Sequence, residues 1–311
     1  MAVPPGADAA AALAIVRREL DPEVAAIERI GEGEWSRCFA FRSGSRDLVV
    51  RIGAHREDFE RDRRAAALAP PDLPVPEVLG LGEAPVGCWC ISTRAWGMPL
   101  EHLDAAGWER ALPSVLAMLG ALAAVDVSAH PQWGSWDGSG RALHPSWEAV
   151  LLAIGIDDDP EYRVAGWLAA LDAHPEDAAL HRRGLAVLAE LAADLDPPRG
   201  LVHGDLVNRN VLVSGDQVTA VFDWGCARYG DPLFDVAWLD VWTPWHPAIA
   251  EVRFRERALA HLGAHGLDLT DADARIRAIQ IYILVEALGY SSLLGRVDDM
   301  AGIGARLRAL L

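Results

Sequence analysis

Apolar residues recur at two different spacings along the chain, and the change of spacing divides it into two parts. In the first part, short apolar runs alternate with turn-rich segments such as GEGEWS at 31–36. This pattern predicts β-strands, which we place at residues 26–30, 38–42, 48–52, 78–82 and 87–92. Helices are predicted over residues 8–20 and 56–69, because both segments have helical composition and meet a proline close after their end.

Beyond residue 100, apolar residues recur every three or four positions, which predicts helices. We place these at residues 108–125, 147–153, 161–171, 179–195, 234–242, 247–263, 271–290 and 298–311. Strand patterns return only at 201–203, 211–213 and 219–222, the last two joined by the turn Ser214-Gly215-Asp216. We therefore expect an α+β fold with a small β-rich lobe over residues 1–92 and a large helical lobe over residues 93–311.

Polar residues interrupt this pattern in LVHGDLVNRNVLV at 201–213, between two runs that otherwise read as buried strands. Buried polar groups are costly unless they are paired or hold a ligand. Asn210 follows Asp205 by five positions, and Asp223-Trp224-Gly225 comes after the next hairpin. Protein kinases have the same order, H-R-D-L-x-x-x-N and then D-F-G. Each motif alone could be a helix cap or a hairpin exit, but their joint occurrence favours catalysis.

The spacing has a chemical reason. Phosphoryl transfer needs one carboxylate at the acceptor hydroxyl and oxygen ligands that hold Mg²⁺ against the ATP phosphates. A loop followed by a hairpin can deliver these groups to one side of a small sheet. A bilobal protein kinase-like fold is therefore the predicted architecture.

The β-rich part contains residues suited to the nucleotide. Gly31, Gly33 and Ser36 lie between the first two predicted strands, where a phosphate-covering loop belongs. Arg51 lies on the third strand, where kinases carry a phosphate-binding Lys, and the chain has no Lys at all. For the carboxylate partner of Arg51 we choose Asp62 first and Glu60 second. The alternative is a surface Arg beside a solvated helix face.

Taken together, HGDxxxxN, DWG and GDPxxD resemble the aminoglycoside phosphotransferase (choline kinase-like) family, and similar segments follow in order over residues 27–240. The resemblance implies a protein-kinase fold and ATP-dependent transfer to a hydroxyl. It implies that Asp205 is the catalytic base and that Asn210 and Asp223 bind Mg²⁺. It further implies that the backbone of Ser92, Thr93 and Arg94 holds the adenine. ATP and Mg²⁺ are thus the expected cofactors.

Charge bears on the acceptor. The net charge is −17, with 15 acidic residues against 11 Arg in residues 1–92 and 30 against 17 in residues 93–311. This argues against nucleic acid as a partner. The negative charge of the second part would attract a cationic ligand, but charge alone favours the simpler interpretation of a solubility surface. The family resemblance implies an aminoglycoside such as hygromycin B as the acceptor. The alternatives are another small-molecule kinase, acting on a macrolide, peptide antibiotic, sugar or amino alcohol, and a non-catalytic pseudokinase.

Acceptor carboxylates are expected at Asp240 and Glu286, with Asp157 to Asp159 as an acidic strip. The side chains of Trp238, Trp242 and Trp245 could stack on sugar rings or belong to the core.

Other residues are assigned structural roles or none. Asp231, Pro232 and Asp235 are expected to begin a helix, with Asp231 as its cap. The four cysteines have no metal-ligand spacing and are expected to be reduced and buried. The chain carries neither a signal-peptide pattern nor an apolar run long enough for a membrane span, so we expect a soluble, cytoplasmic protein. The sequence does not indicate an oligomeric state.

Overall fold

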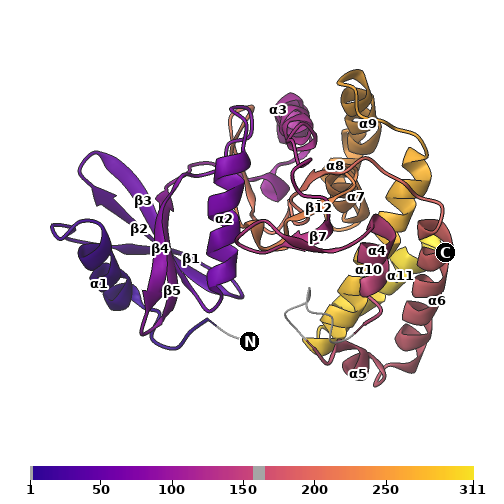
Figure 1. Cartoon of the computed structure of the whole chain (residues 1–311), viewed down its shortest axis with the longest axis horizontal. Coiled ribbons are helices and arrows are strands. Elements are labelled where there is room, and N and C mark those ends of the chain that lie inside the picture. Colours follow the sequence, from indigo (N-terminus) through magenta and orange to yellow (C-terminus); the bar gives the residue numbers. More distant parts are fainter. Residues whose placement is uncertain (1–2, 157–164) are drawn as a thin grey trace.

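The chain folds into two lobes joined by a short linker (Figure 1). The computed structural model describes residues 3–156 and 165–311. The small lobe is built on an antiparallel sheet in the order β1-β2-β3-β5-β4. Its strands are β1 (Glu28–Glu32), β2 (Ser36–Ser43), β3 (Arg46–Gly53), β4 (Val78–Ala84) and β5 (Gly87–Thr93). The expected α+β bilobal fold, with a β-rich first part and a helical second part, is confirmed.

Two helices cover opposite faces of this sheet, and the period of two along β3 explains why (Figure 1). Val50 and Ile52 are fully buried in a cluster with the apolar side of α1 (Ala9–Glu19). Arg51, between them, faces the other way, toward α2 (Arg56–Leu68). The alternation thus places one cation of the strand on the side of the sheet that faces the large lobe.

The linker after β5 is itself paired with the large lobe. Met98–Pro99 forms β6, which pairs with β10 (Val211–Ser214), and β10 forms a hairpin with β11 (Gln217–Val221). At Gly97 the backbones approach so closely that a Cβ would lie 2.8 Å from the carbonyl oxygen of Val213. Residues 94–97 therefore connect the two lobes. They lie next to the domain boundary expected between residues 92 and 93, which stays a prediction.

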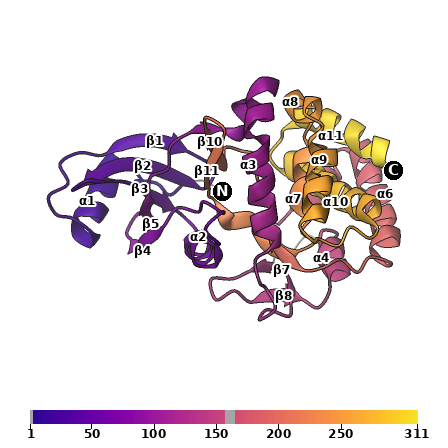
Figure 2. The ribbon, with the colours of Figure 1, turned by 90° about the horizontal axis from the view of Figure 1, so that it is seen from above.

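The large lobe is mainly helical, with α3 near the junction and α10 in the centre of the remaining bundle (Figure 2). Its helices are α3 (Ala105–Ala123), α4 (Trp147–Ala153), α5 (Trp167–Leu171), α6 (Pro175–Ala192), α7 (Phe234–Val241), α8 (Pro247–Glu251), α9 (Phe254–Ala264), α10 (Ala272–Leu293) and α11 (Val297–Leu310). Buried on nearly all sides, α10 packs against α5, α6, α7 and α11. Within the described residues, no helix combines the length and apolarity that crossing a membrane requires.

Several short elements differ from the sequence-based expectation. The helix expected at 247–263 is two helices, because Arg253 adopts φ 53° between them. Short strands at β6, β7 (Trp133–Trp136), β8 (Ala142–His144) and β12 (Arg228–Gly230) were not expected; together with β9 (Gly200–Val202), the last three form a second small sheet. Two to four residues contain too little alternation to be recognised. Part of the helix expected at 161–171 lies outside the described residues.

Candidate active site

A buried hydrogen-bond network fixes the backbone of the loop that follows β9. The carboxylate of Asp235 accepts the backbone N–H groups of His203 at 2.9 Å and Gly204 at 2.8 Å. The His203 ring lies 3.1 Å from the carbonyl oxygen of Phe222 through Nε2, and its Nδ1 lies 3.1 Å from the amide nitrogen of Asp205. Burial lowers the pKa of His203 to about 4, so the ring is neutral. The tautomer with the proton on Nε2 satisfies both contacts.

Two asparagine amides hold the carboxylate of Asp205. Asn208 donates to Oδ1 at 2.8 Å, and Asn210 donates to Oδ2 at 3.0 Å and to the Asp205 carbonyl oxygen at 2.8 Å. Burial raises the pKa of Asp205 to about 8; the charge of Asp223 acts in the same direction, and the amides oppose it. A carboxylate that is fixed in direction and takes up a proton readily is suited to a general base.

Asn210 and Asp223 lie at the same end of the β10–β11 hairpin. Val211 is paired with Val221, and the Phe222 N–H donates to the carbonyl oxygen of Asn210 at 3.0 Å. Because Asn210 uses its NH₂ group toward Asp205, its side-chain oxygen is left for another partner, and the Asp223 side chain is 50% exposed. A carboxylate and an amide oxygen are the hard ligands that Mg²⁺ takes, together with substrate phosphates.

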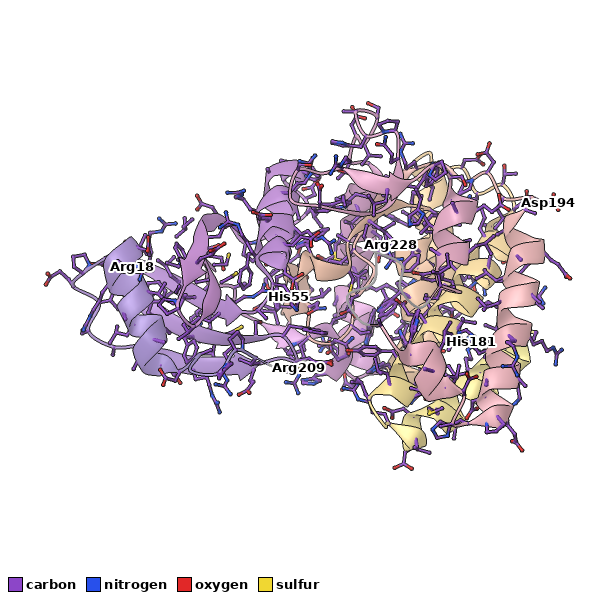
Figure 3. The ribbon with its side chains drawn as sticks, turned by 60° about the horizontal axis from the view of Figure 1, so that its bottom comes forward. Arg18, His55, His181, Asp194, Arg209 and Arg228 are labelled. Carbon is purple, nitrogen blue, oxygen red and sulfur yellow. The ribbon has the colours of Figure 1, made fainter. Side chains whose placement is uncertain are left out.

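The loop backbone adopts a rare conformation at three places. Asn208, Arg209 and Asp223 have φ of 64°, 68° and 64°, in the left-handed region that non-glycine residues seldom adopt. The Arg209 N–H donates to the carboxylate of Glu101, which follows the linker, and thereby holds this conformation. Arg209 lies at the junction of the two lobes (Figure 3). Strained backbone of this kind gathers at functional sites and persists where surrounding contacts fix it.

The pair expected between Arg51 and Asp62 is present. Arg51 Nη1 lies 2.7 Å from Asp62 Oδ2, and Arg51 Nη2 lies 3.7 Å from Asp223 Oδ1. Asp62 also accepts the Trp224 N–H at 2.9 Å through Oδ1. The second choice, Glu60, instead pairs with Arg56 at 2.8 Å. Asp62, the carboxylate of α2 that faces β3, therefore connects the small lobe to the segment that contains Asp223 and Trp224.

A second residue of α2 reinforces this connection, and sequence reasoning did not identify it. Arg61 is 7% exposed and donates to the carbonyl oxygen of Trp136 at 2.7 Å and to that of Gly225. The signal was ambiguous, because α2 carries several charged residues and nothing in their spacing marks the buried ones.

Of the three residues expected in a loop between the first two strands, Gly31 lies in β1, Ser36 begins β2, and Gly33 lies in the tight turn between them. The Gly33 N–H donates to the Ser36 carbonyl oxygen at 2.9 Å, and the β1–β2 register shifts near Gly31. A Cβ placed on either glycine would find its nearest neighbour at 3.9 Å. Packing within the chain therefore does not demand glycine here, and the loop surface is left open for a ligand.

The residues expected to hold adenine have part of their backbone already occupied. The Thr93 N–H donates to the Glu77 carbonyl oxygen and the Arg94 N–H to that of Asp47, both at 3.0 Å. These two N–H groups would have to lose their present hydrogen bonds before they could donate to adenine. The next donors along the chain are Ala95 and Trp96, which lie outside the strand.

Comparison with known proteins agrees with this geometry. The model described as the phosphotransferase enzyme family matches residues 26–272. The chain belongs to this family. It is 31% identical to hygromycin-B 4-O-kinase of Escherichia coli over 291 residues, which cover 93% of this chain and 81% of that protein. The family expected from the motifs is confirmed, and the chain is an ATP-dependent phosphotransferase with an alcohol acceptor.

Solved structures of phosphotransferases are similar over nearly the whole chain. Aminoglycoside phosphotransferase APH(4)-Ia matches with a TM-score of 0.83 and 29% identity, covering 97% of this chain and 98% of that one. A thermostable mutant of it, in a ternary complex with AMP-PNP and hygromycin B, gives 0.82 and 30% over 97% and 98%. Aminoglycoside 2'-phosphotransferase-IIIa with GDP, at 0.65 and 16% over 95% of both chains, shows the fold alone.

The residues expected to bind the acceptor differ in their contacts within this chain. Asp240 accepts from Gln280 at 2.7 Å and lies 3.5 Å from Arg255, so its charge is matched within the helical lobe. Trp238 and Trp242 pack against the core, whereas Trp245 is 40% exposed. Residues 157–159 lie outside the described residues.

Glu286 lies on α10, and its charge contributes to the raised pKa of the Cys226 thiol, for which desolvation is the main cause. The burial expected for all four cysteines is wrong for three of them: Cys226 is exposed, Cys38 and Cys88 are partly buried, and Cys90 is buried. The helix start expected at Asp231 also differs: α7 begins at Phe234, and Asp231 pairs with Arg275 in the core.

An acidic groove that sequence reasoning missed lies beside the candidate catalytic loop, residues 203–210. Its volume is about 510 Å³, and its lining includes Glu101, Asp104, Glu251 and the exposed Trp245. Glu101 belongs to both places, since it lines the groove and holds the backbone of Arg209. The carboxylates come from segments far apart in sequence, so no spacing indicates the groove.

Proposed function

We propose that this phosphotransferase transfers the γ-phosphoryl group of ATP to a hydroxyl of a cationic aminoglycoside of the hygromycin B type and thereby confers resistance to it. The convergence of Asp205, Asn210 and Asp223 at one end of a hairpin supports the reaction. The acceptor is proposed from the similarity to hygromycin-B 4-O-kinase over 93% of the chain. Because ATP is the donor, we infer that the protein acts in the cytoplasm.

The nucleotide would lie between the two lobes. In this proposal Gly31, Gly33 and Ser36 contact its phosphates, and Arg51, held by Asp62, neutralises them. An Arg at this place keeps its charge at any working pH and can form two bonds at once. The adenine would lie along residues 92–97, with donors from the second half of that segment.

Asn210 and Asp223 would hold Mg²⁺, which when bound neutralises charge on the phosphates and the leaving group. The side-chain oxygen of Asn210 and the half-exposed carboxylate of Asp223 fit such an ion. Within the described part of the chain, His, Cys, Asp and Glu do not form a group of three or more that could hold a metal ion. The remaining ligands would then be phosphate oxygens and water.

Asp205 would orient the acceptor hydroxyl and accept its proton. The amides of Asn208 and Asn210 keep both carboxylate oxygens in place, so the base does not have to be ordered when the acceptor arrives. Catalysis in this arrangement comes mainly from positioning and charge neutralisation, since phosphoryl transfer requires little covalent participation by the protein.

The acidic groove is the proposed place for the rest of the acceptor. Its carboxylates would pair with ammonium groups, and the face of Trp245 would pack on a sugar ring. Glu101 would place a charged partner within reach of the catalytic loop. Glu286 and Asp240 remain candidates for further ammonium groups, and the charge of Asp240 is already matched in part by Arg255.

Incubation of the purified protein with ATP, Mg²⁺ and a panel of acceptors tests the proposal, with mass spectrometry as the readout. The panel contains hygromycin B, kanamycin, a macrolide, a peptide antibiotic, a sugar and choline. We expect hygromycin B to gain one phosphoryl group with the natural chain and not with Asp205→Asn. Transfer to the macrolide or choline but to neither aminoglycoside would refute the acceptor assignment.

A further inference from the structure

One side chain of the loop between β1 and β2 crosses to the large lobe. The phenolic hydroxyl of Tyr290 donates to Glu34 Oε1 at 2.7 Å, and Arg296 Nη2 lies 3.8 Å from Glu34 Oε2. Tyr290 lies in the last turn of α10, and Arg296 immediately precedes α11. The loop is therefore attached at its tip to the turn that joins two helices of the large lobe.

The neighbouring acidic residue of the same loop behaves differently. Glu32 pairs with Arg29 at 3.0 Å and with Arg37 at 3.1 Å, both within the small lobe. The two carboxylates are two positions apart in GEGEWS, similar in chemistry, and directed to different partners. Of these two carboxylates, Glu34 is therefore the one whose contacts would change if the small lobe moved away from the large one.

The contact is chemically suited to hold the loop closed. Burial and the hydrogen bond to Glu34 raise the pKa of Tyr290, so the hydroxyl remains a donor over the working pH range. A hydrogen bond from a hydroxyl to a carboxylate is stronger than one between neutral groups. The Arg296 guanidinium adds a longer, partly solvated attraction to the other oxygen, with a side chain that is 51% exposed.

We propose that Glu34 and Tyr290 form an interlobe latch that holds the nucleotide-covering loop over bound nucleotide and has to open before ADP leaves. The inference rests on the proposed function in one respect, the assignment of Gly31, Gly33 and Ser36 to the phosphates. Glu34 and Tyr290 are positioning residues, since neither needs to touch the reacting atoms. Formation of the latch slows nucleotide release without changing the chemistry at Asp205.

Stopped-flow release of a fluorescent ADP analogue from the full chain, with Mg²⁺ and without acceptor, tests the latch. Because a charge-assisted hydrogen bond is lost, Tyr290→Phe and Glu34→Ala should each speed release by about five- to tenfold. The double variant should release little faster than either single variant, since both remove the same contact. Glu32→Ala is the matched control and should release at the natural rate.

Natural release rates in both single variants would overturn the proposal, as would independent effects that multiply in the double variant. A thermal unfolding curve for each variant separates the latch from general destabilisation, and Tyr290→Phe and Glu34→Ala act from different lobes, so one folded variant suffices. The readout needs no acceptor. Failure to phosphorylate hygromycin B would therefore contradict the proposed function and leave the release rates to judge the latch.

Discussion

Replacement of Asp62 by Asn tests the connection between the two lobes most directly. Asn has the same shape and can still accept the Trp224 N–H, but it removes the negative charge beside Arg51. The side chains of Arg51 and Asp62 are 13% and 10% exposed, so solvent cannot replace the missing partner. The variant therefore isolates the cost of leaving a buried guanidinium without its nearest carboxylate.

Removal of one member of a buried ion pair typically costs 3–5 kcal/mol, and we expect about 3 kcal/mol here. The lower end applies because Arg51 retains Asp223 at 3.7 Å. Burial raises the pKa of Asp62 to about 6 against the opposing charge of Arg51, which indicates that the intact pair itself adds little net stability. The double variant Arg51→Met, Asp62→Asn, which keeps the acceptor for the Trp224 N–H, should then lose less free energy of unfolding than Asp62→Asn alone.

Urea unfolding at pH 7 measures these differences, and Glu60→Gln is the control on the same helix. Glu60 pairs with a half-exposed Arg56, so its replacement should cost less than about 0.5 kcal/mol. We expect the KM for ATP to rise in Asp62→Asn and in the double variant, because both disturb Arg51. Equal costs for Asp62→Asn and Glu60→Gln would refute the reasoning.

Three further predictions concern the base, the acceptor groove and pH. Asp205→Asn should lower kcat by about 10²–10⁴-fold while ADP binding is retained, measured by phosphoryl transfer and by titration. Trp245→Ala should raise the KM for hygromycin B by about tenfold and leave the KM for ATP unchanged, because the indole lines the groove and otherwise packs against Trp242 within the large lobe. Burial lowers the pKa of His181 to about 4, so stability is full above the unfolded value near 6.5 and is lost as pH falls toward 4. Between pH 7 and pH 5 the loss at this residue is about 2 kcal/mol, and urea unfolding of His181→Leu should lack it.

The controls for these experiments follow from the positions of the residues. A fall in ADP affinity of Asp205→Asn as large as its fall in kcat would indicate a misfolded loop rather than a lost base. Equal changes in both KM values of Trp245→Ala would contradict a role confined to the acceptor. His181 lies among the helices of the large lobe, away from the junction (Figure 3), so its variant should keep the natural KM for ATP.

The elements that the sequence predicted well are those with a long, regular pattern. The strand that carries Arg51 alternates over eight residues, and α10 extends over 22 residues with apolar side chains nearly throughout. The length and regularity of these patterns identify both elements without knowledge of the rest of the chain. The strand at Arg228–Gly230, by contrast, exists because β7 and β9 flank it, and three residues cannot report partners that lie far away in sequence.

The site divides in the same way. Asp205, Asn210 and Asp223 were identified because local spacing around one hairpin brings them together. Arg61 and Glu34 were missed because they act across the lobes, and Glu101 because its partner Arg209 is distant in sequence; no motif records such separations. Asp62 lies between these cases: the period of a helix restricted the choice to few carboxylates, and only packing decided between it and Glu60.

The pairing of β6 with β10 has a mechanical consequence. The strand that receives the linker begins next to Asn210, so the connection between the lobes and the candidate magnesium ligands share one piece of backbone. Only a few residues of β10 separate its pairing with the linker from Asn210. A displacement of the linker at Gly97, whose backbone lies against Val213, would therefore reach the candidate magnesium ligands directly through β10.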